Sequence, residues 1–225
     1  MPKELQKPDL LPATKGERLA ELVSLVASAA PWIGGPVAEI VGGVATNLKI
    51  KRVTQFIEDV LAHAEALHTE AAEEFVRSED FVDILEKTAS VVANERYEEK
   101  RALFANFILN NISHPQISYD FRLKCLRLLS EVNTRHLDLL GALLQQPTAQ
   151  ELNMSLSAPI TTIRNRTPSI REDLAAIIHE TNTLGLTNIR DNYLNTNMTG
   201  DGAANLHHAV TPLGNDFMRF ITAPN

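Results

Sequence analysis

The side chains with the most chemistry to offer in this 225-residue chain do not fall at the spacings of known active sites. His63 and His68 lie five residues apart, one too many for two zinc ligands on one helical face. His207 and His208 are neighbours, so on a strand they would point to opposite faces. No Walker A sequence and no G-x-S-x-G nucleophile elbow occurs. We therefore expect no catalytic residue, no metal site and no cofactor, and a protein that is not an enzyme.

Cys125 is the only cysteine, so the chain can form neither an internal disulfide nor a cysteine-based zinc site. Because it falls in a leucine-rich helical pattern, we expect a buried and unreactive thiol. The first residues are polar and contain Pro2, Pro8 and Pro12, unlike the apolar core of a signal peptide. Together these features predict a cytoplasmic protein.

Three arginines near the start of one predicted helix are candidates for nucleic-acid contact: Arg164, Arg166 and Arg171. In a winged-helix module that helix would enter the major groove of DNA, where arginines contact phosphates. Glu172 and Asp173 lie on the same helix and offset the positive charge. A solvated helix face and a protein contact are the alternative interpretations.

The charge distribution favours neither nucleic acid nor an anionic membrane as a partner. Residues 1–112 carry 12 basic and 18 acidic side chains, for a net charge of −6, and residues 113–225 carry 9 and 10, for −1. Neither half gives electrostatic support to binding a nucleic-acid backbone. The acidic front half is also repelled by anionic lipid headgroups, unless the burial of apolar side chains outweighs that repulsion.

Residues 19–45 form the least ordinary segment, because they are apolar or small except for Glu21 and Glu39. Pro31 and the Gly34-Gly35-Pro36 run divide the segment, which predicts an apolar helical hairpin. Its halves of about 12 and 10 residues are shorter than the roughly 20 residues that span a bilayer. A core hairpin, a contact with another subunit and membrane insertion on triggering are the three possible roles. The candidate contact residues are Leu22, Val26, Trp32, Ile33, Val37 and Val41.

Helical periodicity continues through most of the chain after a poorly ordered tail at 1–13. A T-K-G-E capping box at Thr14 begins a helix to about Ala30, and a second helix runs from about Pro36 to Leu67. Further helices are predicted after Ser78, over 97–112, over 118–129 and from Asn133.

The sequence pattern of the C-terminal part is less regular than that of the helices before it. Residues 147–168 give no clear pattern, and a capping box at Ser169 and Glu172 then predicts a helix. Short β-like pieces at 187–189 and 208–210 flank a polar loop, and Thr211-Pro212 begins a last helix. The predicted fold is therefore mainly α: a helical bundle over 14–130 that contains the 19–45 hairpin, then a winged-helix-like module over 131–225 with a small β-hairpin.

Several sequence pieces resemble one known family when they are taken in order. They are G-G-P-V-A-E-I-V-G-G at 34–43 with K-I-K-R at 49–52, S-E-D-F-V-D-I-L-E-K at 78–87, Y-E-E-K-R-A-L-F-A-N-F-I-L-N at 97–110, L-S-E-V-N-T-R-H-L-D-L-L at 129–140, L-G-L at 184–186 and V-T-P-L-G-N-D-F at 210–217. In this order the chain resembles the abortive-infection alpha (Abi-alpha) proteins of bacteria. The resemblance implies phage resistance through death or growth arrest of the infected cell, and it implies no known catalytic residues.

The leading hypothesis is a cytoplasmic, non-enzymatic anti-phage protein that acts through protein–protein assembly, as a homo-oligomer or with another protein. Membrane engagement by the 19–45 hairpin on activation is one form of this hypothesis. The alternative is a winged-helix transcription regulator that binds DNA through Arg164, Arg166 and Arg171.

Overall fold

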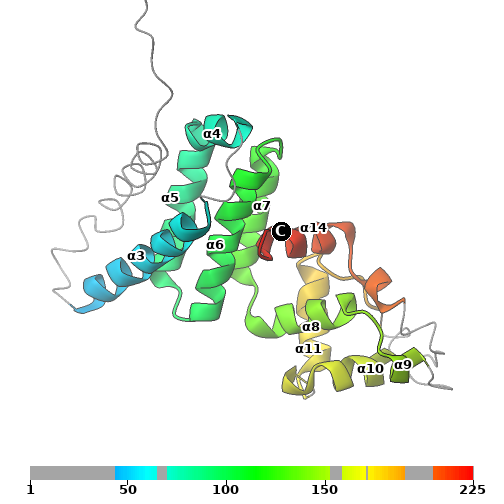
Figure 1. The fold of residues 1–225 in the computed structure, drawn as a ribbon. Coiled ribbons are helices and arrows are strands. Elements are labelled where there is room, and N and C mark those ends of the chain that lie inside the picture. The colour runs from blue at the N-terminus through cyan, green and yellow to red at the C-terminus, as the bar shows by residue number, and fades with distance from the viewer. Residues whose placement is uncertain (1–43, 65–69, 153–158, 171, 191–204, 225) are drawn as a thin grey trace, which may run out of the picture. The chain divides into compact units, whose positions relative to one another are not determined.

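A computed structural model describes residues 44–64, 70–152, 159–170, 172–190 and 205–224 (Figure 1). In these ranges the chain forms α-helices and short 3-10 helices, with one isolated β-bridge and no longer strand. The prediction of a mainly helical fold is thus confirmed for the described part. The predicted tail at 1–13 and nearly all of the 19–45 hairpin lie outside the described residues.

The chain divides into two compact units. The first unit ends at Arg96 and takes in Ile112–Pro115, and the second holds Tyr97–Asn111 and Gln116–Asn225. Most of residues 97–130, which were predicted to belong to the front bundle, is therefore grouped with the C-terminal residues.

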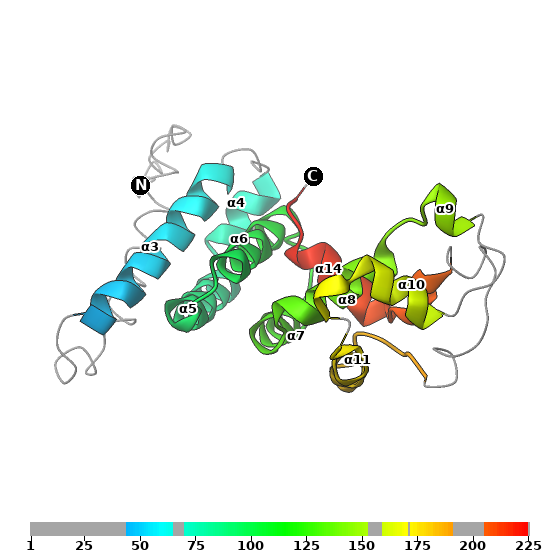
Figure 2. The ribbon, with the colours of Figure 1, turned by 90° about the horizontal axis from the view of Figure 1, so that it is seen from below.

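The described part of the first unit consists of α3 (Val44–Ala64), α4 (Glu70–Val76) and α5 (Glu79–Asn94), with α3 lying along α5 (Figure 2). Buried residues repeat on α3 at the three- and four-residue spacing of one helical face, at Val53, Phe56, Val60 and Ala64. Arg52 ties the two helices together, because its Nη1 donates to the carbonyl of Ala93 at 3.0 Å.

Ser78 begins α5 as the sequence predicts. Its side chain accepts a hydrogen bond from the backbone of Phe81, as an N-cap residue does. The ring of Phe81 meets that of Phe75 edge to face, with centroids 5.4 Å apart. This contact fixes α4 against the start of α5.

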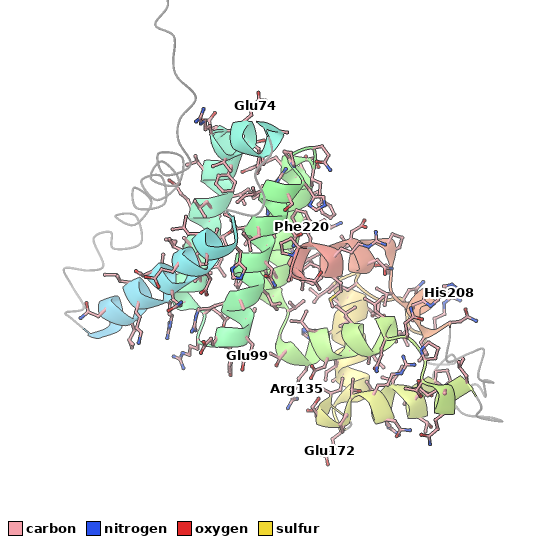
Figure 3. The ribbon with its side chains drawn as sticks, in the orientation of Figure 1. Glu74, Glu99, Arg135, Glu172, His208 and Phe220 are labelled. Atoms are coloured by element: carbon pink, nitrogen blue, oxygen red, sulfur yellow. The ribbon has the colours of Figure 1, made fainter. Side chains whose placement is uncertain are left out.

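The second unit begins with α6 (Glu98–Ser113) and α7 (Tyr119–Glu131) and ends with α14 (Pro212–Ile221). Phe220 of α14 lies beside α7 (Figure 3) and makes edge-to-face contacts with Phe107 and Phe121. The side chain of Asn110 donates to the carbonyls of Phe220 and Thr222, and Asn106 donates to that of Ile221. The last carbonyls of α14, which have no partner in their own helix, are satisfied in this way.

The remaining helices of this unit pack around α8 (Thr134–Leu144), which contacts α10 (Pro159–Arg166), α11 (Leu174–Thr183) and the 3-10 helices at Pro168–Ile170 and Leu206–Ala209. A further short helix, α9 (Ala149–Leu152), lies between α8 and α10 in the sequence. The core around α8 is aliphatic and includes Leu139, Leu140, Leu143, Ile163 and Ile177.

Two of the sequence pieces that carried the family resemblance meet in one junction. Thr211 caps α14 and also donates from Oγ1 to the carbonyl of Gly185 at 2.6 Å. Gly185 has a φ of 73°, a left-handed conformation that glycine adopts without strain. Gly214 lets α14 approach the backbone, because a Cβ there would lie 2.2 Å from the carbonyl oxygen of Leu186. Gly185 is therefore required by its backbone conformation, and Gly214 is required by the packing of α14.

The predicted β-hairpin is not found in the described residues. Thr187 and Val210 form a single antiparallel bridge, and residues 191–204 lie outside the described part. The predicted strand at 208–210 is wrong, because Leu206–Ala209 is a 3-10 helix that buries Leu206 and Ala209. Two apolar residues three apart fit one face of a 3-10 helix, but the stretch is too short for that periodicity to be recognised from the sequence.

The predicted capping box at Ser169 and Glu172 is also wrong. The Ser169 hydroxyl donates to Asp138 on α8, and α11 begins later, at Leu174. A tertiary hydrogen bond has replaced the local cap. In the unassigned stretch 147–168 the structure places α9 and α10, with Pro159 as the first residue of α10.

Candidate functional site

The six residues predicted to contact a partner or membrane lie outside the described part of the chain: Leu22, Val26, Trp32, Ile33, Val37 and Val41. The structure does describe the helix into which their segment leads. Accordingly α3, which begins at Val44, is the nearest described element along the chain to the predicted hairpin.

A second apolar face runs along α3 beside the buried one. Ile50, Thr54, Ile57 and Leu61 recur at spacings of four, three and four residues, which places them on one side of the helix. Ile50 is 51% exposed, and Ile57 and Leu61 are only partly buried. We call these four residues the α3 stripe. Three of its four residues are aliphatic, and Ile50 is the exposed large hydrophobic among them.

The basic residues of α3 lie at its front end. Lys49, Lys51 and Arg52 fall in a stretch, 44–57, that contains no acidic residue, although the whole chain has a charge of −7. Arg52 is used in the bond to Ala93, whereas Lys51 is exposed. The front of α3 thus combines local positive charge with exposed aliphatic side chains, including Leu48 at 50%.

Arg166, one of the three predicted nucleic-acid contacts, is held inside the second unit. Its side chain is only 4% exposed and forms two parallel 2.8 Å bonds to the Glu151 carboxylate. Its Nη1 also donates to the carbonyls of Ala142 and Gln145. Hydrogen bonds from Arg166 lower the pKa of the Glu151 carboxyl to about 2. The guanidinium fastens α9 to α8 and α10 and does not face a phosphate.

The other two arginines differ from Arg166. Arg164 is exposed in the last turn of α10, and Arg171 lies outside the described residues. Exposed acidic side chains lie on α11 and directly before it, including Glu180 and Glu172. Arg135 pairs with Asp173 just before α11, and Figure 3 places Arg135 and Glu172 on the outer surface. The exposed carboxylates of Glu172 and Glu180 oppose the approach of a nucleic-acid backbone to this helix.

His136 and Glu180 form the most enzyme-like pair of the described residues, with 2.6 Å between Nε2 and the carboxylate. The other ring nitrogen, Nδ1, accepts from the backbone N–H of Asn133 and completes a capping box at the start of α8. That acceptor role requires the proton on Nε2 when the ring is neutral. Since the fold uses both nitrogens, the ring holds α8 against α11 and has none left to take a proton from a substrate.

Burial in α7 raises the pKa of the Cys125 thiol to about 12. The side chain is completely buried. A thiol in that state is protonated at neutral pH and does not act as a nucleophile. The prediction that Cys125 is buried is confirmed.

His207 and His208 do not lie on a strand, on which they would have pointed to opposite faces. His207 and His208 lie on the 3-10 helix at Leu206–Ala209, with ring centroids 4.2 Å apart, and His208 is exposed (Figure 3). Successive side chains on a 3-10 helix are rotated by about 120°, whereas on a strand they point to opposite faces. In the described ranges, no group of three or more His, Cys, Asp or Glu side chains is placed to hold a metal ion.

The polar residues that organise the second unit were not predicted from the sequence. The Arg122 side chain is 1% exposed and bonds to the carbonyls of Asn111 and Ile117 and, at 2.6 Å, to the Asn111 side chain. Lys100 reaches the carbonyl of Ser130. A charged residue inside an amphipathic pattern was the only available signal, and it does not reveal a distant backbone partner.

Comparison with known proteins gives no match: no family model fits the chain, and no curated protein or solved structure is significantly similar to it. Among the described helices, none combines the length and apolar character needed to cross a membrane.

Proposed function

We propose that this chain is a non-enzymatic, cytoplasmic protein of bacterial anti-phage defence that acts by binding another protein or a second copy of itself. The observation that carries the proposal is the α3 stripe. It presents the exposed side chain of Ile50 and the partly buried side chains of Ile57 and Leu61, and it follows the apolar 19–45 segment that contains the candidate contacts Leu22 and Val26. Contiguous exposed apolar surface marks sites of interaction with proteins or membranes.

The resemblance to the Abi-alpha proteins supports the biological setting. It rests on the order of motifs from 34 to 217 and implies phage resistance by arrest or death of the infected cell. In this setting the 19–45 segment carries the contact surface, with Trp32 at its tip, and engages its partner after infection. Engagement of a membrane by the same segment is the variant of this proposal that lipid flotation tests.

The reactive side chains of the second unit are occupied by contacts within the fold, which also supports assembly over catalysis. The ring nitrogens of His136 are bonded within the fold, the thiol of Cys125 is buried and protonated, and Arg166 is bonded to Glu151. These groups stabilise the second unit, so they are not available to a substrate.

The second unit serves in this proposal as a winged-helix-like docking module. The order α8, α10, α11, bridge and α14 is compatible with such a module, with the wing falling at 191–204. The exposed Glu172 and Glu180 at α11 speak against DNA as the partner of this module, because DNA phosphates would meet both carboxylates.

Phage plating tests the proposal. The variant Val26→Asp/Val37→Asp places charges on the apolar segment, and we expect it to lose the protection that the wild-type gene gives. The matched control is Ser90→Asp/Gln116→Asp, which adds the same two charges at exposed sites on the described surface. Equal expression and equal thermal melting of both variants show that the loss is not due to unfolding.

Two results would contradict the proposal. Phage would plate equally on cells with and without the wild-type gene, or the Val26→Asp/Val37→Asp variant would protect as well as the wild type.

The DNA-binding alternative rests on the exposed Arg164 and has its own test. It requires a salt-sensitive duplex complex that Arg164→Ala weakens, and no mobility shift at low salt eliminates it.

A further inference from the structure

The described part of the fold leaves the α3 stripe partly open. Ile50 is 51% exposed, and the stripe continues through Thr54 and Ile57 to Leu61, next to the face of α3 that packs on α5. Leu48 is 50% exposed as well. At about 100° per residue, however, it lies about 160° around the helix from Ile50 and is not part of the stripe.

Two exposed side chains of opposite charge accompany the stripe on its solvent side. Lys51 and Glu58 are seven residues apart, so they lie on the same side of α3. At about 100° per residue, both fall about 70 to 90° around the helix from the centre of the stripe, on the side away from the buried residues. The stripe is therefore edged by one cation near its front and one anion further along.

The other charged residues of α3 are placed differently. Arg52 donates to the carbonyl of Ala93 on α5, and Asp59 accepts a hydrogen bond of 3.0 Å from the side chain of Gln55. Lys49 falls next to the buried face and is only partly exposed. The charges that edge the stripe are thus Lys51 and Glu58, and their order makes the stripe complementary to a reversed copy of itself.

A second copy of α3, running in the opposite direction, matches this pattern. With the two stripes centred on one another, Ile50 lies level with Leu61 of the second copy. A two-fold axis perpendicular to the helices brings the same edge of each helix together, so Lys51 comes within about two residues, or about 3 Å along the axis, of Glu58 of the second copy. By symmetry this pair forms twice. A parallel partner would place the two residues on opposite edges of the contact, where they cannot pair.

We propose that the α3 stripe is a homodimer contact, in which two copies of α3 pack antiparallel and are flanked by two ion pairs between Lys51 and Glu58. The contact covers the exposed side chain of Ile50. A contact through one helix is small beside the roughly 1,200–2,000 Å² of stable complexes, so we expect a reversible dimer. The inference rests on the proposed function in giving the stripe a protein partner, whereas the dimer itself is a separate physical claim.

Analytical ultracentrifugation of the full-length protein tests the contact. Ile50→Asp places a charge in the stripe, and the matched control Leu48→Asp places the same charge at an equally exposed aliphatic residue outside it. We expect Ile50→Asp to raise the dissociation constant of the dimer at least about tenfold, and Leu48→Asp to change it less than about threefold. A wild type that stays monomeric at about 100 µM, or equal effects of the two variants, overturns the proposal.

Exchange of the flanking charges tests the ion pairs. Lys51→Glu and Glu58→Lys each bring like charges together, so we expect each to weaken the dimer about fivefold or more at low ionic strength. Because these two variants change the net charge in opposite directions, weakening by both is not an effect of net charge. The double variant Lys51→Glu/Glu58→Lys should return to within about twofold of the wild type. Absence of this rescue, at equal melting temperatures, contradicts the antiparallel register.

Single cysteines report the direction of the helices. In the proposed dimer Thr54 lies about three residues along the axis from its own copy, whereas Ile50 lies about eleven residues, or about 16 Å, from its copy. Since a disulfide requires Cα atoms within about 7 Å, we expect Thr54→Cys to form a covalent dimer under copper phenanthroline at least about tenfold faster than Ile50→Cys. Cys125 does not compete, because it is buried and protonated.

Two cross-linking results overturn the proposal. Equal rates for Thr54→Cys and Ile50→Cys mean a parallel contact, in which each residue meets its own copy. No cross-link in either variant means that the stripe contacts something other than a second α3.

The dimer and the proposed function can fail separately. A dimer that passes these tests, in a protein that gives no protection against phage, leaves the contact intact and removes the proposed function. A wild type that protects against phage but stays monomeric leaves the function intact and removes the contact.

Discussion

Individual residues in this protein have structural roles that their chemical types do not reveal. Arg166, His136 and Cys125 are the side chains that a search for active sites would select. The structure gives each of them a packing role: Arg166 in a bidentate pair, His136 in a capping box and Cys125 in the core. Changes to single residues are therefore expected to alter the stability of the fold.

Gly214 is the position where the smallest change has the largest expected effect. In Gly214→Ala the new Cβ would meet the Leu186 carbonyl oxygen at 2.2 Å, and backbone cannot move aside cheaply. We expect a loss of about 3 kcal/mol or more in the free energy of unfolding, measured by urea denaturation.

Gly141→Ala is the matched control, because a Cβ on that exposed helical glycine meets nothing within 4 Å. It should leave the protein as stable as the wild type or stabilise it by up to about 1 kcal/mol. Similar stabilities for the two variants would refute the close approach of α14 to Leu186.

Acid should weaken the pairing of Glu151 with Arg166. Hydrogen bonds from Arg166 lower the pKa of Glu151 from 4.5 to about 2, so the folded state binds this proton less readily than the unfolded chain. The stabilisation is fully present above pH 4.5 and is lost as the pH falls towards 2.

Thermal melting of Glu151→Gln against the wild type measures this effect. The wild type should melt higher at neutral pH, and the difference should shrink steadily below pH 4.5. A difference in melting temperature that stays constant down to about pH 2 is the result that this interpretation forbids.

At the scale of elements, sequence periodicity predicts helices well where they are long and capped locally. Ser78, Asn133 and Thr211 each cap the helix that the sequence assigns to them. The errors fall where a distant partner overrides the local pattern. Ser169 bonds to Asp138 on α8 instead of capping α11, and a single bridge replaces the expected hairpin in the described residues.

The residues of the candidate functional surface could be predicted from the sequence only in part. The exposed side of α3 could be found from its apolar spacing alone, yet only the structure shows which of its two apolar faces packs on α5. The burial of Arg166 could not be predicted, because its partner Glu151 lies in a stretch with no readable pattern. The motifs behind the family resemblance include packing positions, as Gly185 and Gly214 illustrate.

Asn110 joins two elements that are far apart in sequence, and its loss should be costly. Asn110→Ala removes the donor for the carbonyls of Phe220 and Thr222 at the end of α14. We expect a decrease of about 2 to 4 kcal/mol in the free energy of unfolding, because those carbonyls lose their partner.

Asn94→Ala is the control, since the Asn94 side chain is exposed and bonds only to Ser90 of its own helix among the described residues. It should change the stability by less than about 0.5 kcal/mol. Equal losses in the two variants would show that Asn110 does not hold α14 in place.

At the scale of the whole molecule, the two units differ in the side chains that they carry. In the second unit, charged and polar side chains bond to backbone carbonyls and to one another around an aliphatic core. The first unit instead carries exposed aliphatic residues on α3 and includes the apolar 19–45 segment of the sequence. We therefore infer that the apolar front segment carries the function, while the polar network of the second unit maintains the fold.

The efficiency of phage plating on cells that express Trp32→Ala, compared with cells that express Tyr97→Ala, tests this division of tasks most directly. Tyr97 is the matched control, because it is an aromatic residue that is 67% exposed on the second unit. We predict that Trp32→Ala abolishes protection while Tyr97→Ala retains the wild-type level, at equal expression and melting temperature. Full protection by Trp32→Ala, with or without loss of protection in Tyr97→Ala, would contradict the assignment of function to the front segment.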